Sequence, residues 1–113
     1  MGKLTTHILD TVSGKPAEGI EVELWYVEGD KKHKICAATT NQDGRTEKPL
    51  AENEMFKNGK YELIFFINDY FNNSSNPNFL DTIPIHFGVS DNNNHYHVPL
   101  LLSPFGYSTY KGS

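Results

Sequence analysis

Hydrophobic and polar residues alternate with a period of two along most of the chain, which is the pattern of β-strands rather than of helices. In the first segment, residues 4–9, Leu4 and Ile8 fall on one face and His7 falls on the other. The clearest alternation covers residues 20–27, where aliphatic residues and a tyrosine face one way and glutamates with a tryptophan face the other. Further strands are expected over residues 33–40, 60–67, 83–89, 95–102 and 106–110, with a short one that begins at Arg45.

Turn residues separate these segments at intervals of roughly 8–12 residues, as in small all-β domains. Asp43-Gly44 is the strongest turn signal, because glycine readily adopts the positive φ that tight turns need. A brief helical turn is expected near residues 53–56, and a short helix is expected near the start of the polar stretch 68–80. Short strands without a long amphipathic helix predict one all-β sandwich domain over residues 1–113.

Composition excludes several classes of protein. Ten basic residues against fourteen acidic ones give a formal net charge of -4, so we expect no nucleic-acid partner. No apolar run approaches the roughly 20 residues that cross a bilayer, and no signal-peptide pattern opens the sequence. We therefore expect a cytoplasmic protein without a membrane partner. Cys36 is the single cysteine, which excludes an internal disulfide and a cysteine-based zinc site.

The histidines are the first candidates for chemistry. His95 and His97 are two residues apart on an expected strand, so their side chains emerge on the same face. Such a pair can hold a zinc ion if a third ligand is supplied, and only His7 or His86 is a candidate. The alternative is general acid–base chemistry, since a neutral imidazole accepts protons near neutral pH. These residues by themselves leave both possibilities open, beside that of ordinary surface histidines.

Arg45 is the only arginine among nine lysines, and it directly follows the Asp43-Gly44 turn. Its planar guanidinium can bind carboxylates, imides and oxyanions through two parallel hydrogen bonds, which a lysine cannot do. The C-terminal segment 95–113 carries strand patterns, histidines and several hydroxyl side chains, so we expect it to be used rather than to fray. The alternative for Arg45 is an ordinary exposed residue on a turn, and the alternative for the C-terminal segment is an edge strand with a polar face.

Three segments together resemble the 5-hydroxyisourate hydrolase family, the transthyretin-related enzymes of urate breakdown. They are Thr6–Asp10, Asp43–Arg45 and His95–Ser113, and the resemblance spans essentially the whole chain. It implies an all-β, transthyretin-like sandwich of two four-stranded antiparallel sheets with one short helix after the fifth strand. It also implies a homotetramer, a dimer of dimers, whose central channel holds the active sites.

The family's catalytic residues match His7, Arg45 and His97, and its C-terminal tetrapeptide matches residues 110–113. The resemblance implies hydrolysis of 5-hydroxyisourate to 2-oxo-4-hydroxy-4-carboxy-5-ureidoimidazoline by water attack on a ring carbonyl, without a metal or another cofactor. The two histidines would position and deprotonate the water, His7 would also bind substrate, and Arg45 would hold the substrate and the oxyanion. Tyr110 would bind substrate, and Ser113 would complete the catalytic set.

One residue departs from the family pattern: Lys111 stands where the family usually has arginine. The positive charge is kept, but the bidentate geometry is lost. The fold also serves transthyretin, a hormone carrier without hydrolase activity, so a small-ligand carrier is the alternative function. The carrier lacks the two histidines and the arginine, which this chain has, and this favours the enzyme. A generic interaction sandwich is a further alternative, and it predicts a monomer instead of a tetramer.

Overall fold

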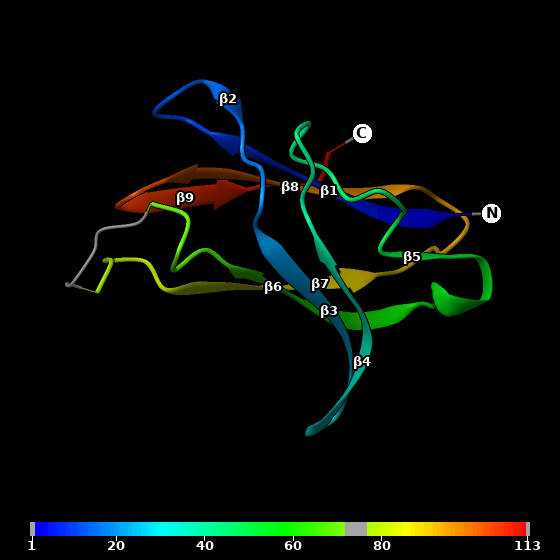
Figure 1. Ribbon diagram of the computed structural model, residues 1–113. Coiled ribbons are helices and arrows are strands. Elements are labelled where there is room, and N and C mark those ends of the chain that lie inside the picture. Colours follow the sequence, from blue (N-terminus) through cyan, green and yellow to red (C-terminus); the bar gives the residue numbers. More distant parts are fainter. Residues whose placement is uncertain (1, 72–76, 113) are drawn as a thin grey trace.

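The computed structural model describes residues 2–71 and 77–112, which form two stacked β-sheets (Figure 1). One sheet has the strand order β2-β1-β8-β9, with β5 also paired to β1, and the other has the order β4-β3-β6-β7. The predicted all-β sandwich is thus confirmed. The elements are β1 (Lys3–Asp10), β2 (Lys15–Pro16), β3 (Glu21–Glu28), β4 (Lys31–Thr39), β5 (Ala51–Glu52), the 3-10 helix η1 (Asn53–Met55), β6 (Gly59–Phe66), β7 (Thr82–Val89), β8 (Tyr96–Ser103) and β9 (Gly106–Thr109).

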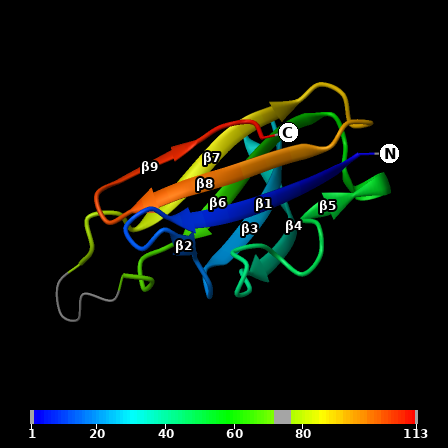
Figure 2. The ribbon, with the colours of Figure 1, turned by 90° about the horizontal axis from the view of Figure 1, so that it is seen from above.

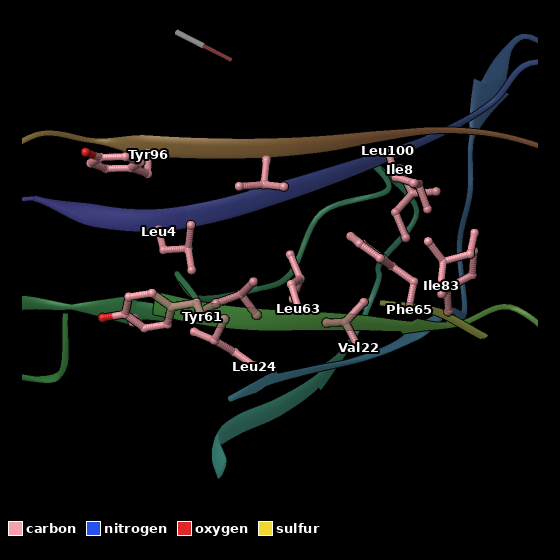
Figure 3. Packing of buried hydrophobic residues seen from close by; sticks show 14 of the residues in the cluster. Leu4, Ile8, Val22, Leu24, Tyr61, Leu63, Phe65, Ile83, Tyr96 and Leu100 are labelled. Atoms are coloured by element: carbon pink, nitrogen blue, oxygen red, sulfur yellow. The ribbon is translucent and has the colours of Figure 1, made fainter. Parts of the chain in front are cut away.

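An apolar core fills the space between the sheets (Figure 3). Leu4 and Ile8 of β1 and Leu63 and Phe65 of β6 are each 0% exposed. Fully burying a side chain of this kind stabilises the fold by about 1.5–3 kcal/mol relative to leaving it exposed. Side chains alternate between the two faces of a strand, so Leu4 and Ile8 point into the core and His7 lies on the outer face, as predicted.

The two strands that carry the histidines run parallel, which the sequence analysis did not expect. β1 pairs with β8 in parallel, with Thr5 opposite His97 and His7 opposite Pro99. The other pairings are antiparallel. The expectation of purely antiparallel sheets was therefore wrong. A tight hairpin forces its strands to be antiparallel, whereas β1 and β8 are joined through the whole second sheet and no local turn fixes their direction. The pairing places β1, from the N-terminal part of the chain, beside β8, from the C-terminal part (Figure 2).

The short strands of the first sheet also differ from those expected from the sequence. The strand expected to begin at Arg45 is replaced by a single bridge between Arg45 and His7, and the short β5 begins only at Ala51. Pro49 lies between them and has no N–H to donate to a ladder. Lys15 and Pro16, which lie between the first two expected strands, form β2, so this sheet has five strands instead of four.

The helical expectations are confirmed at one place and wrong at another. The 3-10 helix η1 corresponds to the helical turn expected near residues 53–56. The helix expected after the strand 60–67 is instead a turn, in which the Tyr70 N–H donates to the Ile67 carbonyl oxygen at 3.0 Å. Asparagine and aspartate side chains compete for backbone hydrogen bonds and so favour turns over helices. In the described part of the chain, no helix has the length and apolar character needed to span a membrane.

Candidate functional site

The outer face of the β1–β8 pair carries the expected catalytic residues. His7 projects from β1 and His97 from β8, and the parallel register places them on neighbouring strands two residues out of step. Arg45 joins them from the turn before β5, through a backbone bridge to His7. The structure therefore brings together three residues that are far apart in the sequence.

The turn at residues 41–45 positions Arg45. The Asn41 side-chain oxygen accepts hydrogen bonds from the backbone N–H groups of Asp43, at 2.9 Å, and Arg45, at 3.3 Å. Gly44 has a φ of 73° and accepts a hydrogen bond from the Ile8 N–H at 2.9 Å. A Cβ atom at position 44 would lie 2.6 Å from the Ile8 carbonyl oxygen. Only glycine lets the turn lie this close to β1, and this approach holds Arg45 beside His7.

The surroundings of His7 and His97 lower the pKa of both side chains and so favour the neutral imidazole. Burial lowers the pKa of His7 below its usual 6.5, and the charge of Arg45 lowers it further, while Asp43 has a smaller, opposite effect. Burial also lowers the pKa of His97, followed by the charges of Arg45 and of the neighbouring His7 and His95. Two neutral imidazoles beside a permanent cation can accept a proton and bind a negative oxygen at the same place.

Thr5 belongs to this cluster, although the sequence analysis missed it. Its hydroxyl lies 2.8 Å from Nδ1 of His97 and 2.9 Å from Nε2 of His95. The available signal was its position two residues before His7 on the outer face of the same strand. Threonine is common in strands for other reasons, so the pattern does not distinguish it.

The C-terminal segment returns to the site along β8. Gly112 forms a bridge with His97, and its N–H donates to the His97 carbonyl oxygen at 2.7 Å. Figure 1 shows the C-terminal end beside β1 and β8. The expectation that this segment is held in place, and not frayed, is confirmed for residues 96–112.

The other C-terminal candidates are only partly tested. Tyr110 is 59% exposed, and together with Lys111 it lines a cavity of about 230 Å³ at the edge of the sandwich. The Lys111 ammonium lies 4.9 Å from the centre of the Tyr96 ring, so its charge is directed toward that aromatic face. Ser113 lies outside the described residues. The substrate-binding role of Tyr110 and the catalytic role of Ser113 therefore stay predictions.

The remaining histidines lie in the second sheet. His33 pairs with Glu28 at 2.9 Å, and His86 lies 3.4 Å from Glu62. His86 belongs to β7 of the second sheet, whereas His97 lies in β8 of the first sheet and His95 immediately precedes it, so His86 is not placed as a third ligand of that pair. Within residues 2–71 and 77–112, no group of three or more histidine, cysteine, aspartate or glutamate side chains is arranged to hold a metal ion.

The fold and the cluster define a class of protein: a two-sheet β-sandwich with two neutral imidazoles and a guanidinium on one outer sheet face. Residues 4–112 match the family model described as the HIUase/Transthyretin family. The chain belongs to this family. The transthyretin-like sandwich expected from the sequence is thereby confirmed.

Individual relatives include both 5-hydroxyisourate hydrolases and a transthyretin. The 5-hydroxyisourate hydrolase 2 of Rhizobium meliloti (strain 1021) is 51% identical over 116 residues, covering 99% of this chain and 97% of the relative. The structure of Klebsiella pneumoniae 5-hydroxyisourate hydrolase is similar with a TM-score of 0.83 and 33% identity, covering 100% of both chains. Sea bream transthyretin in complex with thyroxine is similar with a TM-score of 0.87 and 28% identity, covering 97% of this chain and 94% of the transthyretin. Because the fold is common to both functions, the choice between them rests on the site.

Proposed function

We propose that this protein hydrolyses 5-hydroxyisourate to 2-oxo-4-hydroxy-4-carboxy-5-ureidoimidazoline in urate degradation. The observation that carries the proposal is the bridge between His7 and Arg45 beside His97 on one sheet face. A carrier that only binds a ligand has no need of two neutral bases next to a permanent cation. The identity to the Rhizobium meliloti hydrolase over 97% of its length supports the same activity.

The histidines supply the base. A water molecule between His7 and His97 gives a proton to an imidazole nitrogen while its oxygen forms a bond to a ring carbonyl carbon of the substrate. The adjacent ring C–N bond then breaks, and the proton passes from the imidazole to the leaving nitrogen. The lowered pKa of each histidine keeps the lone pair available at neutral pH. General-base catalysis of this kind contributes about 10² to 10⁴ in rate.

Arg45 supplies the electrostatic part of the reaction. Its guanidinium forms hydrogen bonds to the substrate oxygens and stabilises the oxyanion that develops during the attack. Removing one oxyanion donor costs about 2.7–4 kcal/mol in comparable sites. The Gly44 turn holds the Arg45 backbone against β1, so the cation is positioned before substrate binds.

The C-terminal hydroxyls complete the site in this proposal. Tyr110 binds substrate, and Ser113 takes part in catalysis. The support for this is that the backbone bridge between Gly112 and His97 brings the C-terminal segment to the catalytic strand.

The assembly that we propose is a homotetramer, a dimer of dimers, with the sites in a central channel. Two features support it. Within the described sheets, β7 and β9 are edge strands that are paired on one side only, and the candidate residues lie on an outer sheet face. Size-exclusion chromatography with light scattering distinguishes a tetramer from the monomer that a generic interaction sandwich predicts. The cytoplasmic location expected from the sequence stays a prediction.

The activity is tested directly by generating 5-hydroxyisourate from urate with a uricase and following its decay with and without the protein. We expect the protein to accelerate the decay, and we expect EDTA to have no effect. Unchanged decay combined with tight binding of an aromatic ligand would favour the carrier function instead. Activity that EDTA abolishes would point to a metal held by the histidines.

A further inference from the structure

A single hydroxyl bridges two imidazoles on the outer face of the first sheet. Thr5 Oγ1 lies 2.8 Å from Nδ1 of His97 and 2.9 Å from Nε2 of His95. The centres of the two rings are 6.3 Å apart, with their planes inclined at 62°. Thr5 stands opposite His97 in the parallel register, so the three groups lie across the β1–β8 pair.

The chemistry of the hydroxyl couples the two rings. Threonine has one hydroxyl proton and two acceptor lone pairs, so Thr5 can donate to only one of the two nitrogens. The other nitrogen must then carry a proton and donate to the Thr5 oxygen. The rings are therefore complementary: if Nε2 of His95 accepts the hydroxyl proton, Nδ1 of His97 must donate, and if Nδ1 of His97 accepts that proton, Nε2 of His95 must donate.

We propose that Thr5 holds His95 and His97 in complementary tautomers, which makes Thr5 and His95 positioning residues for His97. Thr5 donates to His95 and accepts from the Nδ1–H of His97, so Nε2 of His97 keeps its lone pair. This inference rests on the proposed function, in which His97 acts as a base. Without the bridge, the ring proton of a neutral His97 is free to sit on Nε2, where it blocks proton acceptance.

The surroundings of His97 leave Nε2 as the nitrogen available for reaction. The Nδ1 side of the ring faces Thr5, and the Cδ2 side faces Gly112, where a Cβ atom would lie only 2.7 Å from Cδ2. Among the described residues, no hydrogen bond involves Nε2 of His97. Arg45 and His7 act on this ring from the neighbouring turn and from β1. The ring is thus fixed on two sides, and its free nitrogen is the one whose protonation Thr5 controls.

The tautomer can be measured without substrate, from the ring ¹⁵N signals of His97 in protein labelled at histidine. We expect the wild type to carry the proton on Nδ1 near neutral pH. Thr5→Val removes the hydroxyl and keeps the side-chain shape, and His95→Ala removes the far partner. Both should move the His97 signals toward the tautomer that carries the proton on Nε2. Thr5→Ser should restore the wild-type signals, and the distant His33→Ala should leave them unchanged.

Kinetics provide the second measurement. We expect kcat to fall about tenfold in Thr5→Val and in His95→Ala with little change in KM, because the bridge acts on the base and not on substrate binding. Thr5→Ser should recover most of the lost kcat. His97 signals in Thr5→Val that match the wild type, or a wild-type kcat in His95→Ala, would overturn this inference. A folded wild type with no hydrolase activity would instead overturn the proposed function, and the ¹⁵N signals would still decide whether Thr5 sets the tautomer.

Discussion

The backbone N–H of Gly112 donates a 2.7 Å hydrogen bond to the carbonyl oxygen of His97, and this bond joins the C-terminal segment to β8. The two residues are also in tight steric contact. A Cβ atom at position 112 would lie 2.7 Å from Cδ2 and 3.3 Å from Cγ of the His97 imidazole. The segment can lie this close to the ring only because residue 112 has no side chain.

Gly112→Ala should therefore displace either the His97 ring or the C-terminal segment. We expect kcat/KM to fall by roughly 10²-fold, since a displacement of about 1 Å at a reacting group costs that much. Gly106→Ala is the matched control, because a Cβ atom there meets only the Ser103 hydroxyl, at 3.8 Å. Equal activities of the two variants would show that the contact with His97 is unimportant.

Arg45→Lys tests whether geometry or charge matters at the guanidinium position. Lysine keeps the positive charge but cannot form two parallel hydrogen bonds to one oxyanion. We expect kcat/KM to fall about 10²- to 10³-fold, as when one oxyanion donor is removed. Lys48→Ala, which changes another exposed cation near the same turn, should keep full activity. A fully active Arg45→Lys enzyme would mean that charge alone suffices.

Lys111→Arg should be tolerated. The Lys111 ammonium lies over the Tyr96 ring at 4.9 Å, and an arginine can make the same cation–π contact. Such a contact at an exposed site contributes about 0.5–1 kcal/mol, so Lys111→Ala should change kcat/KM by only a few-fold. A large loss in Lys111→Arg would show that the site has been rebuilt around a lysine.

The sequence predicts those parts of this molecule that depend on local patterns. The alternation of apolar and polar residues puts Leu4 and Ile8 inside and His7 outside, and period-two burial enforces that division. The parallel pairing of β1 with β8 has no local signal, because it depends on strands at opposite ends of the chain. The role of Thr5 was not predictable for the same reason, since its partners lie about 90 positions away.

The candidate site was predictable only in part. His7, Arg45 and His97 were selected by resemblance to a family, and periodicity alone left them as possible surface residues. The structure adds the reasons that they meet. The parallel pairing of β1 with β8 brings His7 near His97, and the close approach of Gly44 to β1 holds Arg45 beside His7. Patterns of single residues do not reveal contacts of this kind, because they depend on how two segments fold onto each other.

The lowered pKa values of His7 and His97 predict how activity depends on pH. The neutral imidazole is the base, so kcat/KM should rise with pH and level off below the usual histidine pKa of 6.5. Arg45→Gln removes a positive charge that lowers both pKa values, so its normalised profile should shift to higher pH. The free energy of unfolding should also rise with pH in this range, because the unfolded chain binds more protons than the folded one. The stability that these histidines contribute above pH 6.5 is lost as pH falls through their folded pKa values. An unshifted profile in Arg45→Gln would contradict the electrostatic coupling.

We propose that His97, on the outer face of the first sheet, acts as a base in the hydrolysis of 5-hydroxyisourate. A direct test compares the decay of uricase-generated 5-hydroxyisourate with the wild type, with His97→Ala, and with His33→Ala as a control in the second sheet. We expect rapid decay with the wild type and with His33→Ala, and a rate about 10² to 10⁴ lower with a folded His97→Ala protein of unchanged oligomeric state. Decay at the wild-type rate with the His97→Ala protein would show that His97 is not a base in this reaction.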